Sequence, residues 1–132
     1  MKFVCLIAAE KVMEHLAPED AAQHFDEYRR FTTEVRESGQ LLGCHRLLPA
    51  DTATTVRVRD GRTFATDGPF AETKEQIGGF YLIDALDRDD AVRIACRIPG
   101  ARRGSVEVRR IAEDPQTRAA LDAPEASAGN GR

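Results

Sequence analysis

Two short runs restrict the fold of this chain most, because each is apolar at its odd-numbered and its even-numbered positions alike. In the run KFVCLIAA (2–9), one side of an extended strand carries Phe3, Cys5 and Ile7, and the other carries Val4, Leu6 and Ala8. The run FYLIDA (80–85) is apolar on both sets in the same way. Because strands of this kind are buried on both faces, both runs predict strands that are covered from two sides.

Helix signals mark two further segments. Pro18, followed by two acidic residues, predicts a helix over 18–38 that ends at Gly39. Its expected buried stripe is Ala21, Phe25, Tyr28, Thr32 and Val35. Asp87 is a suitable N-cap with Asp90 three residues later, which predicts a helix over 88–98. The inward residues of this second helix are expected to be Ala91, Ala95 and Ile98.

The remaining strands are expected over 41–47 and 105–111, with a hairpin between them in the chain. Alternating runs over 54–59 and 62–66 flank Asp60-Gly61, which is the strongest short hairpin signal. This register places Arg57 opposite Phe64 and Arg59 opposite Arg62. Residues 67–69 predict a turn, and residues 70–76 are either one helical turn or a loop.

Without the hairpin, the order of elements is β-α-β-β-α-β, the ferredoxin-like plan of the α+β class. Right-handed crossovers would place both helices on one face of an antiparallel sheet. The two doubly apolar strands would then leave an apolar face in water. We therefore expect a homodimer, with sheet facing sheet as in a dimeric α+β barrel. A monomer with a half-open apolar face is the alternative. The β-hairpin is expected as an insertion in the ferredoxin-like plan.

Length and charge narrow the class of protein. The length of 132 residues, with a net charge of −3, predicts one domain, over 1–112. Residues 113–132 contain one large apolar side chain, Leu121, and predict a flexible C-terminal tail, in which a helical turn near 116–122 is considered. The near-balanced charge argues against direct binding of nucleic acid or an anionic membrane. No apolar run approaches the roughly 18 residues of a membrane-spanning helix. Three cysteines without a C-x-x-C pair suit a reducing compartment, so a cytoplasmic location is expected.

The densest polar segment begins at Asp67. Two interpretations stay open for it: a turn, or a general base at the mouth of a pocket. The neighbouring candidates for ligand binding are Gly68, Pro69, Phe70, Glu72 and Lys74. His45 is either an acid–base group on a strand or a core residue, and Tyr28 is either a core aromatic or a proton donor. No spacing indicates a metal site and no nucleotide motif is present, so no cofactor is expected.

The stretch TTVRVRDGRTFATDGPFAETKEQIGGFYLID, followed by GSVEVRRI, resembles the YCII-related superfamily and, within it, the DGPF-domain branch. The resemblance covers residues 1–111. It implies a dimeric ferredoxin-like fold with a cleft between helix and sheet near the dimer interface. It also implies a role beside sigma factors of the extracytoplasmic-function type. The superfamily includes a dehydrochlorinase-type lyase with a proposed His–Asp pair; Tyr28 stands at the position of that His, and Asp67 matches the acidic partner.

Two functions are therefore weighed. The first is a small-molecule-binding or regulatory dimer, with a sigma factor as a candidate partner in transcription regulation. The second is a cofactor-independent lyase or isomerase, in which Asp67 is the general base and Tyr28 or His45 is the acid.

Overall fold

The computed structural model describes residues 1–11 and 15–123. Its elements, in chain order, are β1 (Lys2–Glu10), α1 (Pro18–Glu37), β2 (Leu41–Arg46), the 3-10 helix η2 (Ala50–Thr52), β3 (Thr54–Arg59), β4 (Arg62–Asp67), β5 (Glu75–Asp84), α2 (Arg88–Cys96), α3 (Gly100–Arg103), β6 (Ser105–Arg110) and α4 (Pro115–Asp122). Every helix and strand expected from the sequence is present. None of the helices in these two ranges has the length and apolar composition needed to cross a bilayer.

Strand β5 begins five residues before the expected start of this strand, so its first two residues come from the segment predicted as a helical turn or loop. The glycine pair inside β5 explains the longer strand. A side chain at Gly79 would lie 2.9 Å from the backbone oxygen of His45 on β2. Glycine therefore lets β2 and β5 approach closely enough to continue the ladder.

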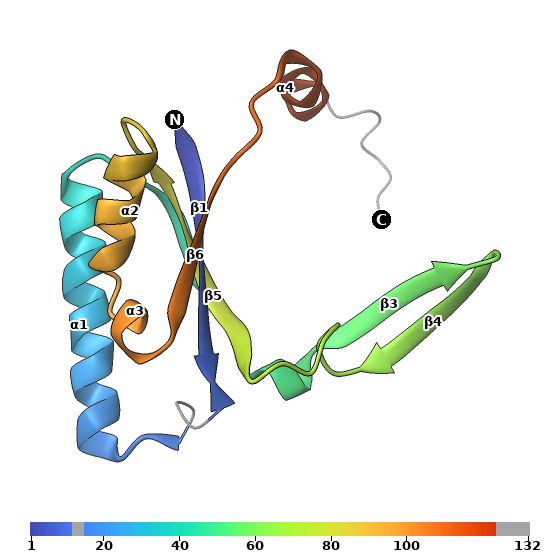
Figure 1. Ribbon diagram of the computed structural model, residues 1–132, viewed down its shortest axis with the longest axis horizontal. Helices are drawn as coiled ribbons and strands as arrows, with labels where there is room; N and C mark the ends of the chain where they lie inside the picture. Colours follow the sequence, from blue (N-terminus) through green and yellow to red (C-terminus); the bar gives the residue numbers. More distant parts are fainter. Residues whose placement is uncertain (12–14, 124–132) are drawn as a thin grey trace.

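The main sheet has four strands in the order β2-β5-β1-β6, and every neighbouring pair is antiparallel. This order and the chain order of the elements are compatible with a ferredoxin-like fold of the α+β class. Helices α1, α2 and α3 all lie on one face of this sheet (Figure 1). Strands β3 and β4 form a separate two-stranded sheet.

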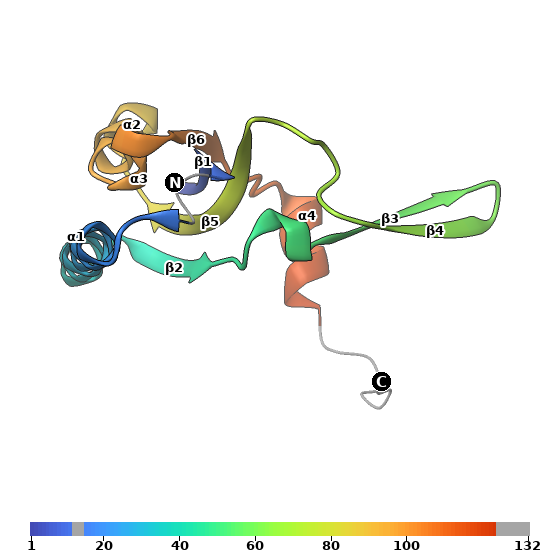
Figure 2. The ribbon, with the colours of Figure 1, turned by 90° about the horizontal axis from the view of Figure 1, so that it is seen from below.

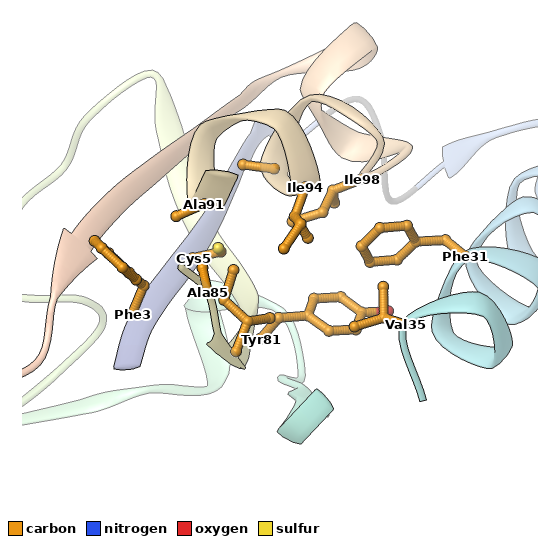
Figure 3. Close-up of a cluster of buried hydrophobic side chains, with 11 residues drawn as sticks. Phe3, Cys5, Phe31, Val35, Tyr81, Ala85, Ala91, Ile94 and Ile98 are labelled. Carbon is orange, nitrogen blue, oxygen red and sulfur yellow. The ribbon is translucent and has the colours of Figure 1, made fainter. Parts of the chain in front are cut away.

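The hydrophobic core lies between the helices and the sheet (Figure 3). Cys5 and Ile83 of the central strands are fully buried there, beside Val35 of α1. The three inward residues expected for the second helix are all buried. The expected stripe on α1 is wrong in part, because Ala21 is exposed and Phe25 is 65% exposed, whereas Phe31 is buried.

The buried face of α1 is made by residues at a helical spacing that overlaps the expected one. His24, Tyr28, Phe31 and Val35 follow each other at intervals of four, three and four residues and are half-buried or buried. Phe31 packs its ring edge against Tyr81 of β5, with ring centroids 5.2 Å apart. This contact with the sheet rotates the helix away from the stripe that the sequence predicted.

The opposite face of the sheet carries no buried side chain. Its residues are recognised by register, because they alternate with the buried residues of β1 and β5. On the two central strands, this outer face consists of Val4, Leu6 and Ala8 of β1 and Phe80 and Leu82 of β5, and all five are only half-buried.

The β3–β4 hairpin, residues 54–67, projects from one corner of the sheet and is here called the arm (Figures 1 and 2). The predicted pairings of Arg57 with Phe64 and Arg59 with Arg62 are confirmed. Asp60 and Gly61 have φ angles of 52° and 76°, the left-handed pair of a tight hairpin turn.

Beyond β6, α4 occupies the position of the helical turn considered near 116–122. Asp114 caps it, because its carboxylate accepts a hydrogen bond of 2.9 Å from the Thr117 N–H. None of the α4 residues is buried. The last nine residues of the tail predicted over 113–132 lie outside the described residues.

Candidate functional site

Tyr28 projects from α1 into the layer between the helices and the sheet. Its hydroxyl oxygen accepts a hydrogen bond of 3.0 Å from the Gly100 N–H at the start of α3. A side chain at position 100 would lie 2.4 Å from that oxygen, so glycine is needed for the contact. Burial raises the pKa of Tyr28 to about 12. The hydroxyl is therefore protonated at neutral pH and braces α3 against α1.

Next to Tyr28, four side chains form what we call the α1–α3 ion cluster: His24, Glu27, Arg102 and Arg103. Oε1 of Glu27 accepts hydrogen bonds from Arg102 at 2.9 Å and from Arg103 at 3.2 Å. A guanidinium nitrogen of Arg103 also lies 2.8 Å from Nδ1 of His24. Because Arg103 donates to its carboxylate, the pKa of Glu27 is held below its usual value. Burial, and then the positive charge of Arg103, lower the pKa of His24.

His45 lies on the other side of the sheet. It pairs with Phe80 across β2 and β5, with the two ring centroids 5.7 Å apart. The next residue, Tyr81, is buried against α1, so Phe80 and His45 face away from the helices. Within one chain, His45 and Tyr28 are therefore separated by the sheet and do not meet in one cavity.

Asp67 ends β4 at the base of the arm, opposite Thr54. Its side chain is exposed and makes no hydrogen bond or ion pair with the described residues. Its carboxylate cannot accept a hydrogen bond from the backbone two residues later, because Pro69 has no N–H. No hydrogen bond joins Asp67 to Tyr28 within the described residues of one chain.

Gly68, and not Asp67, holds the turn at the base of the arm. Its N–H donates to the Ala53 carbonyl at 2.7 Å, and its own carbonyl accepts a hydrogen bond of 2.8 Å from the Thr55 hydroxyl. Gly68 has a φ of +106°, a region that favours glycine. The geometry therefore supports the turn interpretation of this segment.

The other ligand-binding candidates lie in the loop between the arm and β5. Phe70 is 77% exposed, Pro69 is half-buried and Glu72 is exposed. Lys74 lies 3.8 Å from the carboxylate of Glu10, and its side chain is 81% exposed. These residues share the base of the arm with Asp67.

A hollow of about 250 Å³ runs along α1 and includes Tyr28. It is lined by Phe25, Tyr28, Arg29, Thr32, Thr33 and Arg36. Its volume is below the roughly 300 to 1,000 Å³ of typical ligand pockets, and one helix supplies the whole lining. In the described residues, no three His, Cys, Asp or Glu side chains are grouped so that they could hold a metal ion.

Comparison with known proteins gives the family. The chain matches the YCII-related domain over residues 1–114. It is 47% identical over 78 residues to an uncharacterized protein of Rhizobium meliloti (strain 1021), an alignment that covers 58% of this chain and 63% of that relative. The chain thus spans less than two thirds of the relative it matches. The family match covers the whole βαββαβ unit, the arm and the loop that follows it, and the chain belongs to the YCII-related domain family.

Proposed function

We propose that this YCII-related protein is a homodimer that binds a small molecule beside its paired sheet faces, without catalysing a reaction. One observation carries the proposal: the outer face of the four-stranded sheet is apolar along its two central strands, yet none of these side chains is buried in the single chain. Contiguous apolar surface of this kind marks an interaction or ligand-binding site.

A second copy of the same chain suits this face. Two antiparallel sheets pack face to face at about 10 Å, with their inner side chains interdigitated. On β6, Glu107 and Arg109 share the outer face with Leu6 and Val4 and form an ion pair. The rim of the apolar face therefore offers both signs of charge, as a surface that pairs with itself about a two-fold axis needs.

The ligand site is proposed where polar groups border this apolar floor. His45 stands on the outer face, and the arm projects on the same side of the sheet (Figure 2). A few polar groups at the edge of apolar surface are typical of small-molecule sites. The expected ligand is a small, largely apolar molecule with one polar or anionic group that His45 can bind.

Binding is favoured over lyase chemistry by the surroundings of Tyr28. Its hydroxyl oxygen accepts the Gly100 N–H, and a pKa of about 12 makes this hydroxyl a weak general acid near neutral pH. The finer placement in the DGPF branch, a cytoplasmic location and a sigma factor as a further partner belong to the same proposal. The resemblance of residues 67–81 supports the branch and the sigma factor, and the three cysteines without a C-x-x-C pair support the cytoplasmic location.

Light scattering after size exclusion tests the dimer. We expect the wild-type mass to be that of two chains at micromolar concentration, and Leu82→Lys to give the mass of one chain. Leu86→Lys is the matched control, because Leu86 is 81% exposed and lies outside the outer face. A wild-type protein that is monomeric at these concentrations would refute the proposal.

The ligand part is tested with the fluorescent anion anilinonaphthalene sulfonate as a probe. We expect saturable binding to the wild-type dimer and a dissociation constant about tenfold higher in His45→Ala, the effect of one lost hydrogen bond to a charged group. His15→Ala, which changes an exposed histidine of the connection before α1, is the control. Equal affinities of both variants would exclude His45 from the site.

A further inference from the structure

Exposed apolar side chains concentrate around the arm. Seven of the thirteen large hydrophobic residues that are exposed in the described chain lie between residues 47 and 77, and no residue in that stretch is buried. The seven are Leu47, Leu48, Val56, Val58, Phe64, Phe70 and Ile77. A region that exposes so much apolar surface and buries none of it is expected to meet a partner.

The two faces of the arm differ in chemistry. By register, one face carries Val56, Val58, Thr63 and Ala65, with Asp67 at its base, and is here called the apolar face of the arm. The other face carries Thr55, Arg57, Arg59, Arg62, Phe64 and Thr66. Val56 and Val58 are 62% and 58% exposed, so the apolar face of the arm is largely in water in the single chain.

The arm receives little support from its own chain. Backbone and side-chain hydrogen bonds at Gly68 fix its base, and neither of its strands packs extensively against another described element (Figure 1). An isolated two-stranded hairpin is at best marginally stable in water. A regular ribbon of six residues per strand therefore requires a surface against which one of its faces can pack.

We propose that the apolar face of each arm packs against the second copy of the chain, so that the two copies embrace each other. This inference rests on the proposed homodimer and adds a second contact to it. The arm projects on the side of the sheet that the helices leave free, where the second copy would lie (Figures 1 and 2). Leu47 and Ile77, at the junction of sheet and arm, continue the apolar surface from one to the other.

Charge also favours a second copy as the occupant. The arm has three arginines and two aspartates, a net charge of +1, so the rest of the chain carries −4. In the described residues, none of the three arginines lies within 4 Å of a carboxylate. The cationic arm of one copy is therefore attracted to the anionic remainder of the other copy.

Photo-crosslinking with isotope labels tests the embrace. Val58→benzoylphenylalanine is prepared as a mixture of ordinary and ¹⁵N-labelled chains, and crosslinked peptides are identified by mass spectrometry. We expect crosslinks that join labelled to unlabelled chains. Arg59→benzoylphenylalanine places the same group on the cationic face and is expected to give few of them. Crosslinks confined to single chains, or equal yields at both positions, would overturn the proposal.

Substitution of the apolar face provides a second measurement. We expect Val56→Asp combined with Val58→Asp to raise the dimer dissociation constant at least about tenfold, because two valines lose their apolar contact in each copy. The control combines Arg57→Asp with Arg59→Asp, on the other face of the same strand. It separates the loss of apolar contact from the effect of added negative charge. The valine variant is expected to weaken the dimer more than the arginine variant does, and the reverse order would count against an apolar contact.

The two proposals fail in different ways. If the wild-type chain is monomeric, the homodimer and the embrace both fall. If the wild-type chain is a dimer that Leu82→Lys dissociates, while the valine variant associates as well as the wild type, only the embrace falls. The sheet-to-sheet contact then forms the dimer alone.

Discussion

The four-stranded sheet with its helices and the arm are built by different forces. The first region, here called the body, contains all eleven buried hydrophobic residues, which join β1, α1, β5 and α2 across long stretches of chain. The arm contains none of them. Its form instead comes from local signals, the Asp60-Gly61 turn and the alternation of its two strands. The free energy of folding is therefore concentrated in the body, which leaves the arm side chains available for contacts with other molecules.

The largest expected effect is at the centre of the body. Ile83 is fully buried, and Ile83→Ala should lower the free energy of unfolding by about 2 to 5 kcal/mol, from lost transfer energy and the cavity that remains. Val56→Ala, on the arm, should change it by less than about 0.5 kcal/mol when the chain is dilute enough to be monomeric. Urea denaturation measures both. A loss at Val56 as large as that at Ile83 would mean that the arm belongs to the folding core.

The next effect concerns backbone packing at the edge of the body. A side chain at Gly104 would lie 2.1 Å from the backbone oxygen of Ala8 in β1, so Gly104→Ala must displace β1 from β6. We expect a destabilisation of about 1 to 3 kcal/mol in thermal or urea unfolding. Gly78→Ala is the matched control, since nothing lies within 4 Å of that position. Equal stability of the two alanine variants would show that the close approach of β1 does not require glycine at position 104.

The sequence predicted the arm and β1 well because their signals are local. The hairpin turn fixes its own register, and alternation along β1 identifies the residues that share a face. It predicted α1 less well, since stripes through Phe25 and through Phe31 both fit a helical period. The contact of Phe31 with Tyr81 decides between them, and that contact depends on how the sheet assembles.

The candidate site was the least predictable part. Tyr28 and Gly100 are 72 residues apart, and His24 and Arg103 are 79 residues apart, so no motif announces their contacts. The separation of His45 from Tyr28 follows from the position of each residue relative to Tyr81. The face of the sheet on which a residue lies can be assigned in this way only when the strands that pair with its own strand are known.

At the base of the arm, Asp67 and Gly68 should respond differently. Gly68→Ala places a side chain on a residue with φ of +106°, which costs about 1 to 2 kcal/mol locally. It should speed hydrogen exchange of the arm amides about tenfold without changing the melting temperature of the body. Asp67→Ala should alter neither quantity, because its carboxylate has no partner in the described residues. Unfolding of Asp67→Ala would instead give this carboxylate a structural role in the turn.

The smallest expected effect is a pH dependence confined to the body, since the arm contains no histidine. The pKa of His24 is lowered from 6.5 in the folded chain, mainly by burial and then by Arg103, while Glu27 partly offsets this and Arg102 adds to it. The unfolded chain therefore takes up a proton first as the pH falls below 7. The free energy of unfolding should decrease through that range and level off once the folded chain is protonated as well.

Urea denaturation between pH 5 and pH 7.5 measures this effect, and His24→Gln should reduce it. The contribution of Glu27 can be distinguished from that of His24, because Arg103 holds the pKa of the Glu27 carboxyl below its ordinary value of 4.5. Its contribution is lost only at lower pH, below the measured window. The same slope in His24→Gln as in the wild type would show that the α1–α3 ion cluster does not sense pH through His24. A matching change in hydrogen exchange of the arm would show that the arm is coupled to this cluster. We expect no such change, because the arm shares no buried residue with the body.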